Sequence, residues 1–238
     1  MHHDILDIIK ERRTTEDFLP KYVDWDKISR VIDAARHAPS SGNIQNWKFI
    51  VVQSPEKKRL LAEAAFGQHK ITLASTLIVV LGEEDKGERY YGLRGARLYT
   101  IQNCAAATQN MLLEATSLGL GSKWIGAFDE DKVREICSVP SEVRPQAIVA
   151  IGYAKSTPAK PPKYPLESLV YLESWRSKMR NLSRYMKNYT AIFQNNTKQI
   201  KHLANQAVTQ VKEKTAPKTK SITDKLRERL KGKKSKEL

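Results

Sequence analysis

The stretch "APSSGNIQNWKFIVV" occupies residues 38–52 and joins a helical pattern in residues 26–37 to a predicted strand. A connection between a helix and a strand needs only two or three turn residues. This one offers hydroxyls, side-chain amides and a flexible backbone, from Ser40, Ser41, Gly42, Asn43 and Gln45. A bound polar ligand would use that hydrogen-bonding capacity, and buried strand edges would use it as well.

Helical and strand patterns alternate on both sides of this stretch, which predicts an α+β or α/β class with helices on a central sheet. The expected helices cover residues 4–10, 26–38, 54–66, 94–118 and 129–137, and the expected strands cover residues 47–53, 75–83, 122–128 and 145–154. The helix over residues 94–118 is apolar on most faces, so we expect it to be buried nearly all round.

Charge divides the chain into two parts. Residues 1–154 hold 20 Lys and Arg against 20 Asp and Glu, whereas residues 155–238 hold 21 against 6 and so carry the whole net charge of +15. A Pro- and Lys-rich linker follows the last strand. The domain organisation we predict is a folded domain over residues 1–165, a long heptad-patterned helix over 166–212 and a basic, disordered tail over 213–238.

A second polar motif lies at the end of the first predicted helix. Arg12, Arg13 and Thr14 combine two guanidinium groups with a hydroxyl. Guanidinium groups form charge-assisted, bidentate hydrogen bonds to phosphate oxygens, so the motif suits a phosphorylated ligand. Two arginines at a helix C-terminus also complement the helix dipole, and the sequence leaves both interpretations open.

Five motifs in order resemble the nitroreductase family of flavoproteins. They are "RRTTEDF", "APSSGNIQNWKFIVV", "GQHKITLASTLIVV", "AAATQNMLLEATSLGLGSKWIGAF" and "RPQAIVAIGYA", and the resemblance covers about residues 4–172. It implies an α+β fold with a central mixed sheet flanked by helices. It also implies a homodimer that holds one FMN in each of two sites at the subunit interface, here with a C-terminal helical extension.

The resemblance also implies which residues hold the flavin. Arg12, Arg13 and Thr14 match the motif for the FMN phosphate and ribityl chain. The loop residues that match the motif reaching the flavin from the partner subunit are Pro39, Ser40, Ser41, Asn43 and Gln45. Backbone amides around Ile125, Gly126 and Ala127 should approach the N5–O4 edge of the ring. Lys163, or Lys160 in its place, should contact the phosphate. We expect no catalytic side chain and no metal.

The chain departs from the family pattern in three places. Asn46 stands where the family usually has proline, which we expect to loosen the loop after Gln45. Lys123 stands where a small residue or cysteine is common, and its side chain either favours an anionic substrate or points to water. Residues 82–97 are too few for a long substrate lid.

Two functions follow from these features. The first is an oxidoreductase that passes hydride from NADH or NADPH through FMN to a small acceptor, such as a nitroaromatic or a quinone, in a ping-pong cycle. The second is a flavin-fold scaffold whose tail binds nucleic acid, an anionic membrane surface or an acidic protein. Heptad pairing of the helices between subunits is a further use of the extension.

Two isolated cysteines and the absence of a signal-peptide pattern lead us to expect a cytoplasmic protein.

Overall fold

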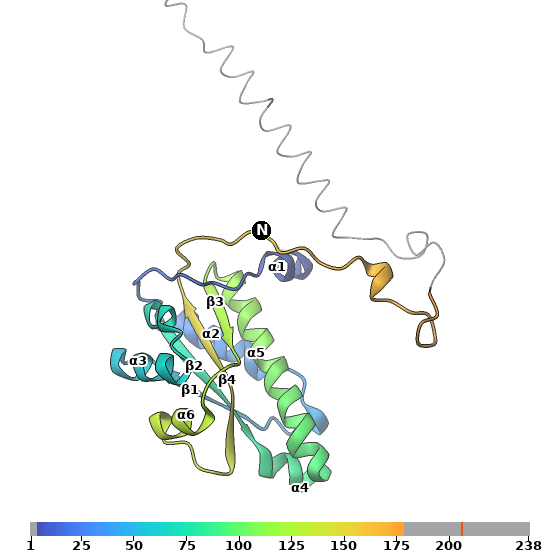
Figure 1. Ribbon diagram of the computed structural model, residues 1–238, viewed down its shortest axis with the longest axis horizontal. Helices are drawn as coiled ribbons and strands as arrows, with labels where there is room; N and C mark the ends of the chain where they lie inside the picture. The colour runs from blue at the N-terminus through green and yellow to red at the C-terminus, as the bar shows by residue number, and fades with distance from the viewer. Residues whose placement is uncertain (1–3, 179–205, 207–238) are drawn as a thin grey trace, which may run out of the picture. The chain divides into compact units, whose positions relative to one another are not determined.

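A four-stranded antiparallel sheet forms the centre of the fold (Figure 1). The computed structural model describes residues 4–178 and residue 206. The strand order is β1-β2-β4-β3, with β1 at Trp47–Val52, β2 at Thr76–Glu83, β3 at Gly121–Ile125 and β4 at Val143–Gly152. All four expected strands are present, and the α+β class is confirmed.

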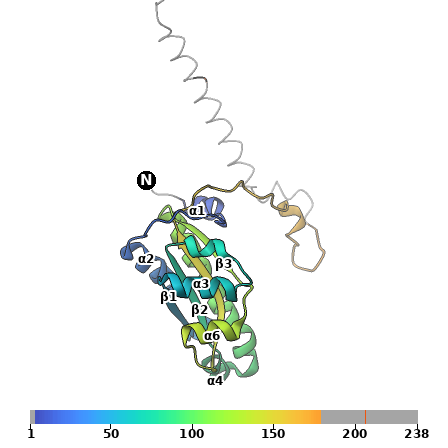
Figure 2. The same cartoon turned by 60° about the vertical axis from the view of Figure 1, so that its left-hand side comes forward.

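Helices cover both faces of the sheet, and β2 and β4 are therefore buried on both sides. Ile78 and Val80 point to one face, where α2 (Trp25–Arg36) and α5 (Thr100–Ser117) pack. Leu77 and Val79 point to the other, where α3 (Pro55–Ala64), η2 (His69–Leu73) and α6 (Glu130–Cys137) pack. Figure 2 shows α3 and α6 lying across that second face. Because successive side chains of a strand point to opposite faces, each central strand contributes to two separate hydrophobic cores.

The helix expected over residues 94–118 is divided in the structure. A π-helical turn, η3, covers Gly95–Tyr99, and α5 follows it and ends before Gly119, whose φ is +70°. The expectation that this helix is buried nearly all round is wrong for the single chain. Its inner side packs on α2 and the sheet, but Gln102 and Gln109 are exposed and Ile101 is 40% exposed. Nothing within the described chain covers that outer side.

One helix was not predicted. α4 spans Glu84–Arg94 and turns back tightly on η3. Gly87 and Gly95 allow this approach, because a Cβ on Gly95 would lie 2.0 Å from the Gly87 carbonyl oxygen. Non-helical angles at Tyr91 and Gly92 bend the last turn of α4.

Residues 162–178 belong to a second unit of the chain. The helix predicted to begin at residue 166 does not include them. Leu166–Ser168 forms a single 3-10 turn, and Tyr171 bridges Lys178 in an antiparallel arrangement. Leu172 N–H donates to the Ser177 oxygen at 2.8 Å, so local backbone bonds replace the helical ones. Gln206 is helical, whereas residues 179–205 and the basic tail lie outside the described residues.

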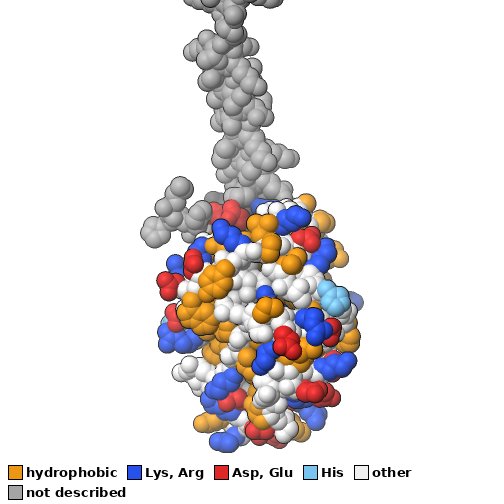
Figure 3. Space-filling view, turned by 90° about the vertical axis from the view of Figure 1, so that its left-hand side faces the viewer, with side chains coloured by type: hydrophobic (Ala, Val, Ile, Leu, Met, Phe, Trp, Pro, Cys, Tyr) orange, Lys and Arg blue, Asp and Glu red, His pale blue; other side chains and the backbone are white. Residues whose placement is uncertain are grey.

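The surface of the folded domain mixes both signs of charge. Figure 3 shows acidic and basic side chains interspersed with hydrophobic ones on the side that faces left in Figure 1. This agrees with the zero net charge of residues 1–154. Within residues 4–178, no helix combines the length and apolarity needed to cross a membrane.

Candidate functional site

The segment that follows α1 (Ile5–Glu11) lies against the outer edge of β3. Thr14 pairs with Ser122 in an isolated parallel bridge, and Thr15 N–H donates to the Ser122 oxygen at 2.9 Å. The segment then crosses to the end of β4, where Phe18 pairs with Ala154. These bonds hold the residues between Arg12 and Phe18 at one end of the sheet.

The two arginines play different parts in this segment. Nη1 of Arg13 donates to the backbone oxygens of Lys10 and Arg12 at 2.7 and 2.6 Å, so Arg13 caps the C-terminus of α1. Its Nε is buried without a hydrogen-bond partner in the described chain. Burial, and then the charge of Arg12, lower the pKa of Arg13. Within residues 4–178 neither guanidinium forms an ion pair. Arg13 contacts the C-terminus of α1, but both arginines can still bind an anion.

Lys123 lies on β3 beside this segment and does not point to water. Its ammonium is 2.7 Å from the Glu16 carboxylate, and its side chain is only 14% exposed. Of the two alternatives for Lys123, the one in which its side chain points to water is therefore wrong. Its charge is neutralised by Glu16, which also fastens the arginine segment to β3.

The end of β3 offers backbone groups at the edge of the sheet. Ile125 is buried in the second core, whereas Gly126 and Ala127 are exposed. Their amides donate no hydrogen bond to the described residues. Residues 126 and 127 directly follow the edge strand β3, and the contact of Ile125 and Gly126 with a flavin stays a prediction.

The loop between α2 and β1 has an unusual backbone. Gly42, Asn43 and Gln45 all have positive φ, at 53°, 57° and 46°. Inside the loop, Gln45 N–H donates to Ser40 Oγ at 3.0 Å, and Gln45 Nε2 donates to Asn43 Oδ1 at 2.9 Å. The side chains of Asn43 and Gln45 are exposed. Pro39, at the start of the loop, is exposed as well.

Asn46 tightens this loop, so the expectation that it loosens the loop is wrong. Its side chain is fully buried, and Nδ2 donates to the Glu83 oxygen at 3.1 Å and to Thr100 Oγ1 at 2.7 Å. Its Oδ1 accepts from Asn103 Nδ2 at 2.8 Å. Sequence reasoning missed Asn103. The available signal was an asparagine placed among the apolar residues of a helix that packs on the sheet.

The two sets of predicted flavin contacts lie at opposite ends of the sheet. Trp47, directly after the loop, pairs with Gly82 at the end of β2, whereas Ser122 shares a row with Ile151 and Thr76 at its start. Six residues of extended strand separate these rows by roughly 20 Å. The fold therefore does not bring Arg12 and the loop to one ligand within a single chain.

The two candidate lysines follow β4. Lys160 is exposed near the end of the first unit, five residues beyond Lys155, whose N–H donates to the Asp17 oxygen. Lys163 is exposed and belongs to the second unit. Their contact with a phosphate stays a prediction.

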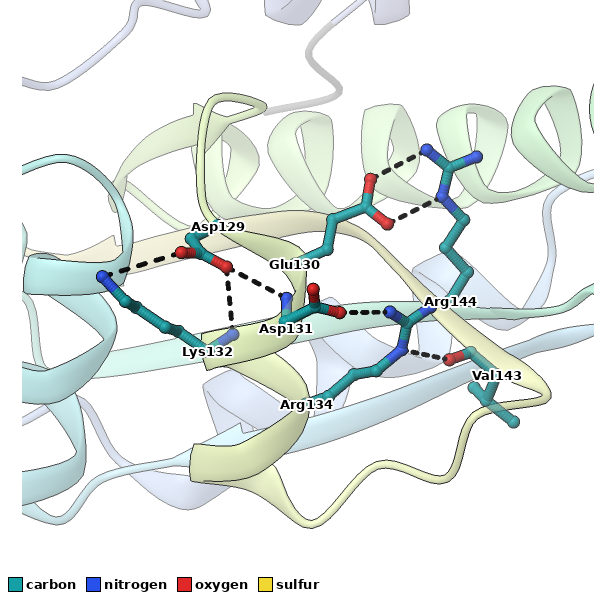
Figure 4. Close-up of polar contacts among 7 residues, drawn as sticks. All are labelled: Asp129, Glu130, Asp131, Lys132, Arg134, Val143 and Arg144. Carbon is teal, nitrogen blue, oxygen red and sulfur yellow. Dashed lines mark hydrogen bonds and ion pairs between the residues drawn. The ribbon is translucent and has the colours of Figure 1, made fainter.

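A cluster of charged residues surrounds the first turn of α6 (Figure 4). Arg144 on β4 donates two hydrogen bonds to Glu130, at 2.9 and 2.8 Å. Asp129 caps the helix by accepting from the N–H groups of Asp131 and Lys132, at 3.1 Å each. Since each carboxylate here is paired with a cation or a backbone donor, the cluster anchors α6 to β4 and offers no ligand site.

Comparison with known proteins gives a consistent result. The Nitroreductase family model matches residues 9–82 and 66–153. An NADH dehydrogenase of Thermus thermophilus is 31% identical over 196 residues, covering 69% of this chain and 90% of that protein. An FMN reductase (NADPH) of Bacillus subtilis is 26% identical, covering 77% and 79%. The crystal structure of a nitroreductase family protein from Clostridium difficile 630 superposes with a TM-score of 0.64 at 30% identity, covering 73% of this chain and all of the other.

Proposed function

This chain belongs to the nitroreductase family, and we propose that it is a homodimeric, FMN-dependent oxidoreductase. It would transfer hydride from NADH or NADPH to a small acceptor such as a nitroaromatic or a quinone. Two similar proteins named for NADH dehydrogenase and NADPH-linked FMN reductase activity support both the nicotinamide donor and the flavin.

The arginine segment fits the phosphate of FMN. Arg12 and Arg13 form no ion pair within residues 4–178, and the buried Nε of Arg13 lacks a partner there. Guanidinium groups that have no anionic partner in this part of the chain can form charge-assisted hydrogen bonds to phosphate oxygens. This is the observation that carries the proposal. Thr14 and Lys160 would complete the phosphate contacts within the first unit.

The separation of the two site halves supports a homodimer. The arginine segment and the loop of residues 39–45 lie at opposite ends of one sheet, so a single flavin can meet both only where two chains join. In a two-fold dimer, each end of one chain would face the opposite end of the other, which gives two equal sites. Ile101, on the exposed outer side of α5, would add an apolar side chain to such a contact.

The residues of this chain would bind and orient the cofactor. When bound, FMN supplies the hydride chemistry, accepting from the nicotinamide and giving to the acceptor in separate half-reactions. The free amides of Gly126 and Ala127 would donate to the polar edge of the ring, and Ser40, Ser41, Asn43 and Gln45 would contact it from the partner chain. Donors that are already oriented stabilise negative charge without reorganisation. No side chain needs to act as an acid or a base.

The experiment is a spectrum of the purified protein. With FMN added, one flavin per chain should bind and show oxidised-flavin absorbance, which NADH or NADPH should bleach under anaerobic conditions. Adding a quinone or a nitroaromatic compound should restore the colour. A protein that binds no FMN, or whose bound flavin resists both nicotinamides, would overturn the proposed function.

A further inference from the structure

A buried network of amides and hydroxyls lies beneath the loop of residues 40–45. Asn46 and Thr100 are fully buried, and Asn103 is 3% exposed. Asn103 Oδ1 accepts from Ser41 N–H at 3.0 Å, and Asn103 Nδ2 donates to Asn46 Oδ1 at 2.8 Å. The network therefore connects the loop backbone to α5 through two asparagine side chains.

The network leaves no amide group of Asn46 unpaired. Its two donor bonds reach the Glu83 oxygen and Thr100 Oγ1, and the Thr100 hydroxyl in turn donates to the Gly95 oxygen at 2.8 Å. The backbone oxygen of Asn46 also accepts from Glu83 N–H at 2.8 Å. Fully satisfied polar groups in a low-dielectric interior specify one arrangement, because any other leaves a buried group unpaired.

The loop backbone needs such support. Asn43 and Gln45 adopt left-handed angles without being glycine, which costs free energy and persists only where the surroundings fix the conformation. Ser41 is the loop residue that Asn103 binds by hydrogen bonds, and it comes directly before the three positive-φ positions 42, 43 and 45. These bonds therefore fix the backbone where the strained conformation begins.

We propose that Asn103, together with Asn46, is a positioning residue that holds the loop of residues 40–45 in the shape required to meet FMN. This rests on the proposed function and extends it to two buried residues beneath the loop. Asn46 then replaces the rigidity that proline would give at this position with hydrogen bonds to two elements, β2 and α5.

The test compares Asn103→Ala and Asn46→Ala with Asn110→Ala. Asn110 is a matched control, because it is an asparagine of the same helix whose side chain donates to the Ala34 oxygen of α2 at 3.0 Å. Two readouts are needed: hydrogen exchange of the peptide covering residues 38–46 in the flavin-free protein, and the Kd for FMN. Melting temperatures show how much general destabilisation each variant brings.

In Asn103→Ala we expect faster exchange at Ser41 and a Kd for FMN raised about tenfold or more. Asn110→Ala should leave both unchanged even at a similar loss of melting temperature. The double variant Asn46→Ala/Asn103→Ala should bind FMN about as weakly as Asn103→Ala alone, since both changes break one network. If Asn103→Ala does not fold, Thr100→Val keeps the side-chain shape, removes one link and should shift both readouts in the same direction.

Two outcomes separate this inference from the proposed function. If the wild-type protein binds no FMN, the proposed function fails, whatever the exchange data show. If the wild type binds FMN and the loop peptide of Asn103→Ala exchanges faster with no change in Kd, the loop is held but its position does not matter for binding. That result, or equal Kd values for the variants at residues 103 and 110, would overturn the inference.

Discussion

Thr14 pairs with Ser122 across a parallel bridge, which lays the arginine segment along the free edge of the sheet. Arg12 is thereby held two residues from a fixed contact, with a side chain that forms no ion pair within residues 4–178. A backbone held by hydrogen bonds and a guanidinium without an ion pair suit the phosphate site that we propose.

Arg12→Ala should therefore weaken FMN binding without unfolding the protein. Loss of one charge-assisted phosphate contact should raise the Kd by about 10- to 150-fold, or about 1.5–3 kcal/mol. Titration of flavin fluorescence measures this. Arg59→Ala is the control, because it removes the same charge from α3, where Arg59 pairs with Glu63. An equal loss of affinity in both variants would mean that overall charge, and not a phosphate contact, drives binding.

Gly42→Ala should destabilise the protein for two separable reasons. The φ of +53° costs an alanine about 1 kcal/mol, and its Cβ would lie 2.1 Å from Tyr91 Oη. Gly119→Ala isolates the first cost, since φ there is +70° and nothing lies within 4 Å. In chemical unfolding, Gly42→Ala should lose more stability than Gly119→Ala, and Tyr91→Phe should restore part of the difference. Failure of Tyr91→Phe to rescue would contradict the contact between Tyr91 and the loop.

The Glu130–Arg144 pair should make a small, pH-dependent contribution to stability. The hydrogen bonds from Arg144 lower the pKa of Glu130 below its ordinary value of 4.5. The contribution is therefore complete above pH 4.5 and disappears as the pH falls through the lower, folded-state pKa. Both side chains are more than a third exposed, so Glu130→Gln should cost less than about 1 kcal/mol at pH 7.

The stability difference between wild type and Glu130→Gln should vanish in acid. Urea unfolding of both proteins at several pH values between 3 and 7 measures it. Asp131→Asn is the matched control. Asp131 also pairs with an arginine, Arg134, but the side chain of Asp131 is 93% exposed (Figure 4). A difference for Glu130→Gln that grew as the pH fell would contradict the assigned direction of the pKa shift.

The two cysteines should differ in reactivity in the native protein. Burial raises the pKa of Cys104 to about 12, and its Sγ lies in the core beneath β2, whereas Cys137 is only partly buried. Since the thiolate is the reactive form, iodoacetamide at pH 8 should label Cys137 well before Cys104. Peptide mass spectrometry reads the two sites, and both should label at similar rates in denaturant. Early labelling of Cys104 would show that the α5–β2 contact opens readily.

The regular elements of the fold could be predicted because their signals are local. Ser54 and Asp129 cap α3 and α6 within the predicted helix ranges, and both cores follow the alternation of the strands. α4 escaped prediction because its two glycines normally argue against a helix. Gly87 is required by a close approach to Gly95, a contact between residues that no local pattern reveals.

The residue types of the site could be predicted from the sequence, but the buried hydrogen bonds that hold the loop could not. Serines and amides next to a strand indicate a polar loop, yet nothing in the sequence shows that Asn46 and Asn103 meet. The partner of Lys123 was hidden for the same reason, since Glu16 lies 107 positions away. For the residues beyond 165, the heptad spacing is a real pattern. However, residues 166–178 form a turn and a bridge. Their backbone groups bond to one another, as Leu172 N–H does to the Ser177 oxygen, in place of helical hydrogen bonds.

The most direct test of the proposed account is a heterodimer that carries one defect in each chain. Arg12→Ala would sit in one chain and Asn43→Ala/Gln45→Ala in the other, with two affinity tags used to isolate the mixed dimer. If each site combines the arginine segment of one chain with the loop of the other, one site carries both defects and the other carries none. The heterodimer should then bind one FMN with wild-type affinity, while both parent homodimers bind weakly. A heterodimer with two equally weak sites would show that each site is built within one chain and would contradict the account.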